Sequence, residues 1–312
     1  MYYFIVNPKA HGGLGEKVWR KLEHQIEKSG IDYEVHLTKE RGDAKRLAGE
    51  LTRRETDPGD TAQVLVAVGG DGTVNEILDG LSFDKPMTLG YIPTGSGNDL
   101  ARSLRLPKNP RRCLKRILNP RYYLSMDYGI ISYEKEEPVH RRFMVSCGIG
   151  LDAAVCHNML DVAARPCRGI IRSGRLTYIL LELKQLLLAR PVKGYLLLDG
   201  VKKVEFNHIY FISSHIHGSE GGGFRFVQKA DYSDGQMNIC VVHNSSKLHV
   251  VPVLADALFG RTGHHRGVRF YQCREVSIHT ERPMPVHVDG ESCFCQTDIH
   301  LRCVEKALKM II

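Results

Sequence analysis

Apolar residues follow two different patterns in the first 120 or so residues of the chain. Runs such as 2–7 and 63–68 are short and almost wholly apolar, which is typical of buried strands. Residues 16–28 and 43–51 instead carry apolar side chains three and four positions apart, as on one face of a helix. Alternating strands and helices predict a parallel sheet with helices on both faces. The expected strands are 2–7, 32–38, 63–68 and 88–93, and the expected helices are 16–28, 43–51 (with Asp43 as N-cap), 73–81 and 97–104.

The pattern changes near residues 122–131, and later apolar stretches read as short strands separated by turns. Asp199-Gly200 predicts a hairpin turn, and one long apolar helix is expected at 174–190. We therefore predict two domains. The first is an α/β domain at 1–125, completed by about 297–312, and the second is a mainly antiparallel β domain at 126–296. The hairpin is expected at 194–206, and further strands of the second domain are expected at 207–214, 237–243, 267–279 and 284–292.

Composition adds few constraints. With 312 residues, 43% hydrophobic and 25% charged, the chain is ordinary for a folded soluble protein of two modest domains. It has no run of about 18 apolar residues, so no transmembrane helix is expected, and residues 1–10 lack the basic region of a signal peptide. The nine cysteines form an odd set without a C-x-x-C pair, which argues against a disulfide framework or a zinc site. We expect reduced thiols and a cytoplasmic protein.

The formal net charge of +8 admits phosphates, nucleic acid or anionic lipid surfaces as partners. The basic residues form separate clusters at 109–116, 164–175 and 260–269 rather than one tail. Each cluster could equally be a solvated surface. Because no recognisable nucleic-acid-binding motif accompanies the charge, no nucleic-acid partner is expected.

Three glycine-rich turns, at 7–15, 69–76 and 93–102, each follow an expected strand and precede a helix. Glycines let backbone N–H groups approach an anion, and a helix N-terminus adds a favourable potential. In the first turn Asn7 could orient the loop, and Lys9 and His11 could face phosphate. An ordinary strand-to-helix connection remains an alternative for this turn alone.

The second turn, "GGDGTVNE", places glycines on both sides of Asp71. Ligands bind at the carboxyl ends of strands in open α/β sheets, and a carboxylate there can hold Mg²⁺ directly or through water. Thr73 could cap the following helix and touch phosphate. Neither G-x-G-x-x-G nor the Walker A pattern fits the turn. In the third turn Asp99 opens a helix, and it could be only a favourable N-terminal charge. Together the three turns predict one crevice rich in phosphate and metal contacts.

A fourth feature, "VDGES" at 288–292, lies far along the chain. Asp289-Gly290 could be only a hairpin turn. If Glu291 faces the crevice, it could act as a general base on an alcohol.

These turns belong to a set of six motifs that spreads over nearly the whole chain, and the set resembles the diacylglycerol kinase family of bacterial lipid kinases. That family is related to sphingosine and ceramide kinases, and more distantly to NAD kinases. The pair "GGDGTVNE" and "PTGSGNDLAR", about 20 residues apart, is its most specific part. The matching motifs are "NPKAHGG", "GGDGTVNE", "PTGSGNDLAR", "GGGFRF" (221–226), "YSDGQMNI" (232–239) and "VDGES".

The resemblance implies an N-terminal nucleotide-binding domain of the phosphofructokinase and NAD kinase type, joined to a C-terminal β-sandwich with the active site in the cleft between them. It also implies transfer of the γ-phosphoryl group of ATP to a lipid hydroxyl with Mg²⁺, and diacylglycerol is the first candidate acceptor. By position, Asp71 and Asp99 would organise the catalytic Mg²⁺, and Glu291 would accept the proton. The implied nucleotide-binding residues are Asn7, Pro8, Lys9, Ala10, His11, Thr38, Gly69, Gly70, Asp71, Gly72, Thr73, Val74, Asn75 and Ser96.

A structural Mg²⁺ is implied in the "YSDG" turn, with the Asp234 carboxylate and backbone oxygens near Asp231 and Gln236 as ligands. The sequence departs from the family in two places. Many relatives have a Ser or Thr before the glycines of the first loop, and a Pro is common ahead of the metal turn, where this chain has "RFVQKADYSDG".

Other functions stay open. The acceptor could be a sphingoid base, monoacylglycerol, phosphatidylglycerol or NAD, or the chain could bind nucleotide without catalysis. The intact set of Asp71, Asp99 and Glu291 favours an enzyme. The helix at 174–190 could be a core helix or could meet lipid, with Arg165, Arg168, Arg172 and Arg175 near anionic headgroups. We therefore expect peripheral contact with a membrane surface, and a homodimer remains an open alternative.

Overall fold

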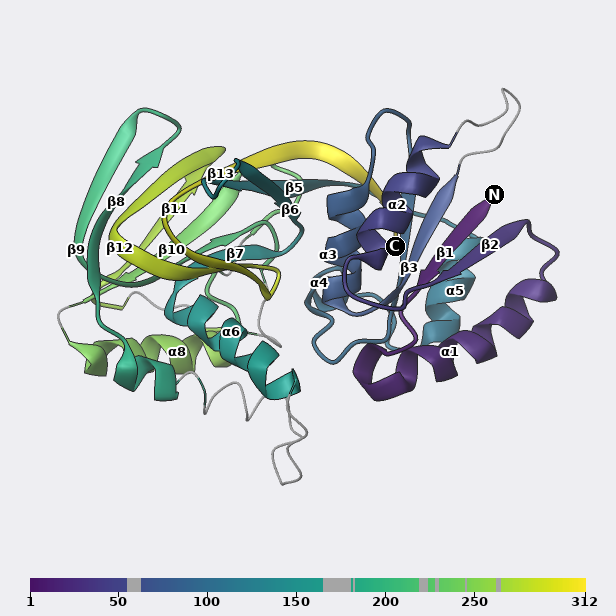
Figure 1. Cartoon of the computed structure of the whole chain (residues 1–312), viewed down its shortest axis with the longest axis horizontal. Helices are drawn as coiled ribbons and strands as arrows, with labels where there is room; N and C mark the ends of the chain where they lie inside the picture. Colours follow the sequence, from purple (N-terminus) through teal and green to yellow (C-terminus); the bar gives the residue numbers. More distant parts are fainter. Residues whose placement is uncertain are drawn as a thin grey trace. The chain divides into compact units, whose positions relative to one another are not determined.

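The computed structural model in Figure 1 describes residues 1–54, 63–164, 181, 183–218, 224–227, 230–244, 246–261 and 265–312, without the side chains of 159–164. The chain forms two compact units. The first comprises Met1–Met126 with Lys306–Ile312, and the second comprises Asp127–Glu305. Residues 297–305, which we expected in the first domain, lie in the second unit.

The first unit is built on a parallel sheet with the strand order β13-β4-β3-β1-β2. Its strands are almost wholly apolar because helices cover both faces. Phe4 and Val66 pack with Trp19 and Ile117 on one face, under α1 and α5, while α2 and α3 lie on the other (Figure 1). The predicted α/β architecture is confirmed. The strands are β1 (Tyr2–Val6), β2 (Tyr33–Leu37), β3 (Val64–Gly69), β4 (Thr88–Pro93) and the end of β13 (Glu291–Ile311).

All four expected helices of this unit form, and a fifth, α5, occupies a stretch that we interpreted only as a basic cluster. Asn109 caps α5 by accepting a hydrogen bond from the Arg111 N–H at 2.9 Å, and Pro110 occupies its first turn. The helices are α1 (Ala10–Glu27), α2 (Asp43–Arg53), α3 (Asp71–Gly80), α4 (Asp99–Ser103) and α5 (Pro110–Leu118).

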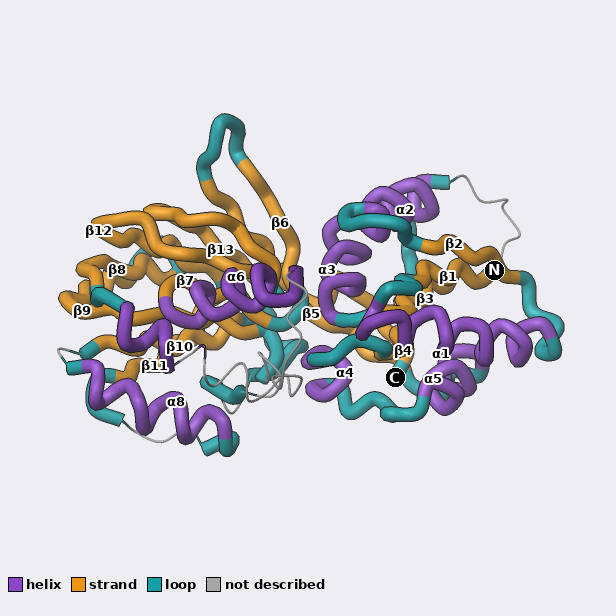
Figure 2. Tube along the Cα trace, turned by 60° about the horizontal axis from the view of Figure 1, so that its bottom comes forward, coloured by secondary structure: helices purple, strands orange, loops and turns teal. Residues whose placement is uncertain are grey.

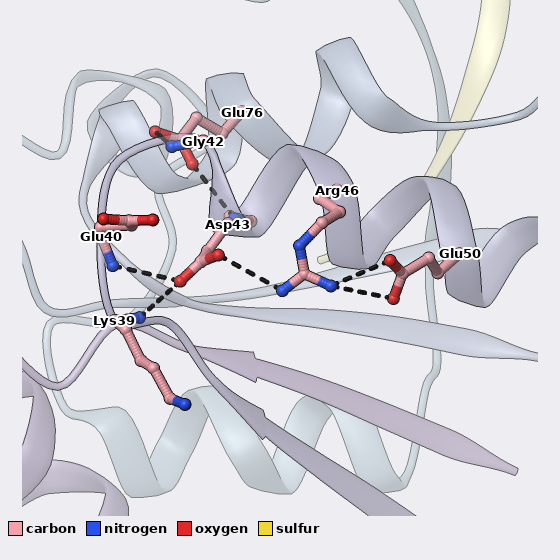
Figure 3. Close-up of polar contacts among 8 residues, drawn as sticks. Lys39, Glu40, Gly42, Asp43, Arg46, Glu50 and Glu76 are labelled. Atoms are coloured by element: carbon pink, nitrogen blue, oxygen red, sulfur yellow. Dashed lines mark hydrogen bonds and ion pairs between the residues drawn. The ribbon is translucent and has the colours of Figure 1, made fainter.

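The prediction that Asp43 is the N-cap of α2 is wrong. Gly42, with φ of 91°, holds that position because a left-handed conformation costs glycine little. Asp43 is the first helical residue, and its carboxylate accepts hydrogen bonds from the N–H groups of Lys39 and Glu40 at 2.8 and 3.1 Å (Figure 3). These two bonds lower the pKa of the Asp43 carboxyl group.

The second unit is an antiparallel arrangement in which β11, β10, β9, β7, β12 and β13 follow one another, and β8 joins β9 to β12 (Figure 2). Inward-facing side chains of these strands form its main core. The antiparallel β prediction is confirmed. The remaining elements are β5 (Tyr123–Tyr133), β6 (Val139–Phe143), β7 (Ser146–Gly150), α6 (Leu151–Ala164), β8 (Val192–Leu198), β9 (Lys202–His215), β10 (Met237–His243), a 3₁₀ turn (Lys247–His249), α8 (Val250–Leu258), β11 (Val268–Cys273) and β12 (Glu275–Val288).

The hairpin predicted at Asp199-Gly200 forms between β8 and β9, and both turn residues have positive φ, 50° and 67°. The helix predicted at 174–190 lies largely outside the described residues, within which 181 and 183–188 are helical. Arg165, Arg168, Arg172 and Arg175 also lie outside them. Within the described part of the chain, no helix is long and apolar enough to span a membrane.

His217 gives the second unit a sensitivity to acid. The side chain is fully buried, stacks on Tyr232 with ring centroids 5.1 Å apart, and has a pKa lowered to about 3 by burial. Because the unfolded chain binds this proton near pH 6.5, the free energy of unfolding should fall by roughly 1.5 kcal/mol between about pH 6.5 and pH 5 through His217 alone.

We expect His217→Phe to keep the ring stacked on Tyr232 and to reduce this pH dependence. Urea unfolding at the two pH values, followed by far-UV circular dichroism, measures it, since the single tryptophan, Trp19, lies in the first unit. His24→Phe, at an exposed position of α1, is the matched control. An unchanged slope in His217→Phe would contradict the assignment.

Candidate active site

The three glycine-rich turns follow β1, β3 and β4 and lie at the edge of the sheet where these parallel strands end. Their first residues are joined by backbone hydrogen bonds that continue the strand pairing. The Asn7 N–H donates to Val68 O at 2.8 Å, and the Thr94 N–H donates to Gly69 O at 2.7 Å. Thr38, at the end of β2, donates its N–H to Val6 O at 2.9 Å. The structure therefore brings the residues predicted on four strands to one edge.

The first loop runs through a left-handed stretch at the start of α1, with φ of 47°, 64° and 91° at His11, Gly12 and Gly13. A Cβ at Gly15 would lie 2.0 Å from Asn7 O, so only glycine lets the helix approach this carbonyl. Two basic side chains of the loop contact backbone oxygens of the protein. Lys9 Nζ donates to Lys39 O at 2.7 Å, and His11 Nδ1 lies 3.4 Å from Gly95 O. Phosphate contacts from Lys9 and His11 remain predictions.

In the second loop the N-cap position of α3 is occupied by Gly70, so no side chain caps this helix. The predicted capping role of Thr73 is therefore wrong. Its buried hydroxyl instead accepts a hydrogen bond from Asn7 Nδ2 at 3.2 Å, which ties the first two loops together. Asn75, one of the predicted nucleotide contacts, is also buried.

Glu76, in the same motif, has a structural contact. Its carboxylate accepts hydrogen bonds from the N–H groups of Gly42 and Ala44 at 2.9 and 3.2 Å (Figure 3). It thereby satisfies donors at the N-terminus of α2 that have no partner within that helix. Part of the "GGDGTVNE" sequence is therefore explained by the packing of α3 against α2.

The third loop approaches the second closely at the backbone. A Cβ at Gly95 would lie 2.5 Å from the Gly70 Cα, so Gly95 has no room for a side chain, and a Cβ at Gly70 would lie 3.1 Å from the Gly95 Cα. Asn98 closes the third loop, since its Oδ1 accepts the Gly95 N–H at 3.0 Å and its Nδ2 donates to Gly95 O at 2.8 Å. The Tyr91 hydroxyl donates to the same Asn98 Oδ1 at 3.2 Å. Ser96, a predicted nucleotide contact, lies exposed at the tip.

Asp71 and Asp99 meet beside Gly97. A Cβ at Gly97 would lie 2.9 Å from Asp71 Oδ2 and 3.5 Å from Asp99 Oδ2. Asp71 Oδ1 accepts the Leu100 N–H at 3.4 Å, and Asp99 pairs with Arg102. Burial raises the pKa of Tyr91 well above its usual value, and the charges of Asp71 and Asp99 raise it further.

Two neighbouring carboxylates at strand ends are a suitable donor set for a hard cation such as Mg²⁺. The predicted positions of both aspartates are confirmed, since Asp71 follows the end of β3 and Asp99 opens α4. The prediction did not select Arg102, which pairs with Asp99, or Tyr91, which donates to Asn98.

Glu291 is the first residue of β13 and belongs to the second unit. It pairs with Val288 across the Asp289-Gly290 turn, where φ is 48° and 84°. The predicted hairpin turn therefore forms. The Asp289 carboxylate accepts three backbone hydrogen bonds of 2.7 to 3.0 Å, from the N–H groups of Met144, Val145 and Ser146. The catalytic role of Glu291 remains a prediction.

The second predicted metal site lies in a turn of the second unit that its own residues hold closed. Asp231 Oδ1 accepts bonds from Ser233, and Asp234 Oδ1 accepts the Gln236 N–H at 3.0 Å. The buried Asp127, which lies outside every motif identified in the sequence, accepts the Gly235 N–H at 2.7 Å. Burial, followed by the charges of Asp127, Asp234 and Glu305, raises the pKa of Cys303 to about 12. A structural Mg²⁺ at this acidic turn remains a prediction.

Comparison with known proteins identifies the family. The sequence model of the diacylglycerol kinase catalytic domain matches residues 1–127, and that of the YegS C-terminal NAD kinase beta sandwich-like domain matches residues 145–312. The chain belongs to the diacylglycerol kinase family of lipid kinases, and the resemblance stated from its motifs is confirmed.

Individual relatives are distant but cover nearly the whole chain. Diacylglycerol kinase of Bacillus subtilis is 25% identical over 92% of this chain and 88% of its own length. A probable lipid kinase, YegS-like, of Chromohalobacter salexigens is 29% identical over 88% and 82%. The crystal structure of a diacylglycerol kinase from Bacillus anthracis superposes with a TM-score of 0.73 at 20% identity, covering 99% and 96% of the two chains. The last comparison supports the fold, and membership of a kinase family implies the use of ATP.

Gly95→Ala tests the contact between the second and third loops. The added methyl group would overlap the Gly70 backbone, so we expect the first unit to lose about 1–3 kcal/mol of unfolding free energy. Urea unfolding followed by the fluorescence of Trp19, which is buried in the core of this unit, measures the loss. Ser96→Ala, one residue away and exposed, should change stability by less than about 0.5 kcal/mol. Equal effects of the two substitutions would refute the steric argument.

Proposed function

We propose that the protein is an ATP- and Mg²⁺-dependent lipid kinase that transfers the γ-phosphoryl group of ATP to a lipid hydroxyl. Diacylglycerol, which would give phosphatidic acid, is the first candidate acceptor. The observation that carries the proposal is the pair of carboxylates, Asp71 and Asp99, beside the backbone contact of two glycine loops. Family membership supports the same reaction class.

Each part of the site has a role in this reaction. The loops at 7–15, 69–76 and 93–102 would bind the phosphates of ATP through backbone N–H groups. Asp71 and Asp99 would hold Mg²⁺, which supplies charge neutralisation when bound. The lipid oxygen forms a bond to the γ-phosphorus as the bond to the bridging oxygen breaks and ADP leaves. Glu291 would accept the proton of the lipid hydroxyl, so the proposal requires that it reach the γ-phosphate during transfer.

An acceptor with a long apolar part is favoured over a soluble one by the relatives, which carry the names diacylglycerol kinase and lipid kinase. The apolar side chains between α8 and strands β10 and β11 do not form a lipid pocket. The void that they enclose measures about 10 Å³, which is room for about one water molecule and not for an acyl chain. Burial in the core of the second unit accounts for the apolar inner face of α8, through Phe226, Cys240, Val253, Ala257 and Val268.

Glu291→Gln separates nucleotide binding from transfer. We expect affinity for ATP to be retained, because the loops lie in the first unit, while transfer falls about 10²–10⁴-fold. Radiolabelled ATP incubated with diacylglycerol, monoacylglycerol, phosphatidylglycerol, sphingosine and NAD measures transfer and identifies the acceptor. Glu281→Gln, an exposed carboxylate on β12, is the control, and Asp71→Asn should lose Mg²⁺-dependent turnover. If the parent protein labels no lipid in this panel, the lipid kinase proposal fails.

The proposal extends to peripheral contact with a membrane through α8. The helix buries Val250, Val253, Leu254 and Ala257, yet its opposite face is also apolar. Val251 and Phe259 are 41% and 71% exposed, and Leu248 just before the helix is 80% exposed. Apolar residues on the exposed face of a helix can be buried at the boundary between the headgroups and acyl chains of a membrane.

Basic residues accompany this face. Lys247 precedes it and donates to Leu187 O, and Arg261 follows it. Arg225 is exposed and is attached to the helix end by a 2.9 Å bond from its N–H to Ala257 O. The carboxylate of Asp256 is paired with His265 at 2.8 Å. An apolar stripe with cations beside it is suited to an anionic lipid surface.

Val251→Glu combined with Phe259→Glu should weaken sedimentation with phosphatidylcholine–phosphatidylglycerol vesicles by about tenfold or more, because charged groups would have to enter the lipid layer. Val201→Glu, at the β8–β9 turn and 88% exposed, provides a control in the same unit. If the two proteins sediment equally, α8 is not the membrane face.

A further inference from the structure

A buried group of three polar side chains in the second unit has no place in the reaction described above. Asp152 and Cys156 lie one turn apart on α6, and His287 lies on β12. Potential ligand atoms of the three residues lie within 4.8 Å of one another. The residues are 7%, 5% and 3% exposed, so the group is enclosed by protein.

The hydrogen bonds of His287 argue against a metal centre here. Its Nδ1 accepts the Gly290 N–H at 3.1 Å, and its Nε2 lies 2.8 Å from Asp152 Oδ1. A ring that accepts at Nδ1 carries its proton at Nε2 and donates it to the Asp152 carboxylate. A histidine that binds metal through Nε2 normally donates an N–H from Nδ1 to an acceptor, which is the opposite arrangement. The geometry therefore defines a chain of hydrogen bonds from Gly290 through His287 to Asp152.

Close packing fixes this chain of bonds in place. His287 pairs with Gly148 of the neighbouring strand β7. A Cβ at Gly148 would lie 2.2 Å from Asp152 Oδ2 and 2.5 Å from His287 Nε2, so glycine is required for the approach of the strand. Asp152 Oδ2 has no hydrogen-bond partner among the described residues, and the bond from His287 is the one that this carboxylate receives from them.

The far end of the chain of bonds is the turn that carries Glu291. Gly290 directly precedes Glu291, and both Asp289 and Gly290 adopt positive φ. Asp289 fixes one side of the turn to the backbone of residues 144–146. His287 fixes the other side through Gly290. A turn held on both sides leaves Glu291 little freedom to shift.

We propose that His287 is a positioning residue for Glu291. Its Nδ1 fixes the Gly290 amide, and Asp152 holds the imidazole in the tautomer that can accept that bond. The proposal rests on the proposed function, because it assigns His287 a role in presenting the proton acceptor of the lipid kinase reaction. His287 itself touches neither substrate nor nucleotide in this scheme.

Two substitutions separate the two hydrogen bonds. His287→Asn places an amide oxygen near the position of Nδ1, so it can keep the Gly290 bond while losing the bond to Asp152. His287→Gln places an amide nitrogen near the position of Nε2, so it can keep the Asp152 bond while losing the bond to Gly290. We expect His287→Gln to lower kcat at least tenfold with little change in KM for ATP, since small displacements of a reacting group reduce rates strongly. His287→Asn should stay within about threefold of the parent kcat but unfold at a lower temperature, because the buried carboxylate loses its donor.

Initial rates with diacylglycerol in mixed micelles and thermal unfolding of both variants give these comparisons. If the parent protein is active and the two variants have equal kcat, the positioning role is refuted. If the parent labels neither diacylglycerol nor any other acceptor of the panel, the proposed function fails, which is a different result. A folded parent protein also permits a test without substitution, using ¹⁵N-histidine NMR. The expected signal is a neutral ring protonated at Nε2, and a ring protonated at Nδ1 would overturn the proposal even where a variant fails to fold.

Discussion

The backbone contact between Gly70 and Gly95 is the constraint on which the first unit's site depends. The two loops, which follow adjacent strands, can meet at this distance only when residue 95 has no Cβ, and a Cβ at residue 70 would lie 3.1 Å from the Gly95 Cα. The contact brings Asp71 and Asp99 to either side of Gly97, and it places Gly95 O near the His11 ring. Gly70 and Gly95 are thus explained first by the close approach of two backbone segments of the same chain.

Electrostatics then sets the character of this edge of the sheet. Two carboxylates close together, one of them buried, repel each other, and burial weakens their hydration. Arg102 and the Leu100 N–H offset part of this cost. The raised pKa of Tyr91 keeps its hydroxyl neutral as a donor to Asn98 beside the two negative charges. A divalent cation would relieve the remaining repulsion, which is the physical reason that such a pair suits a magnesium-dependent reaction.

The sequence predicted the elements with a clear apolar pattern, either a short wholly apolar run or one apolar face of a helix. Strand–helix alternation identified every strand of the first unit's sheet up to β4, and the turn motifs located the three loops. It missed α5, where only Cys113, Leu114 and Ile117 are buried and the basic residues dominate, and α6, which lacks a polar face that would reveal its period. Asp152 and His287, which contact each other, lie 135 positions apart in the sequence, so no short sequence pattern predicts this contact. The role of Glu76 at the start of α2 was equally hidden, because its motif suggested a ligand.

The pairing of β13 with β4 has a consequence for how the molecule can be divided. Lys309 and Met310 pair with Thr88 and Leu89, so β4 is an inner strand only because residues from beyond the second unit reach it. A fragment made of residues 1–126 would leave that side of β4 as an open edge with free N–H and C=O groups. β4 also leads into the loop that carries Gly95 and Asp99. Dissecting this protein into its two units would therefore remove the strand that supports β4 and the loop after it, and a circular permutant that joins residues 306–312 to the first unit would keep the strand.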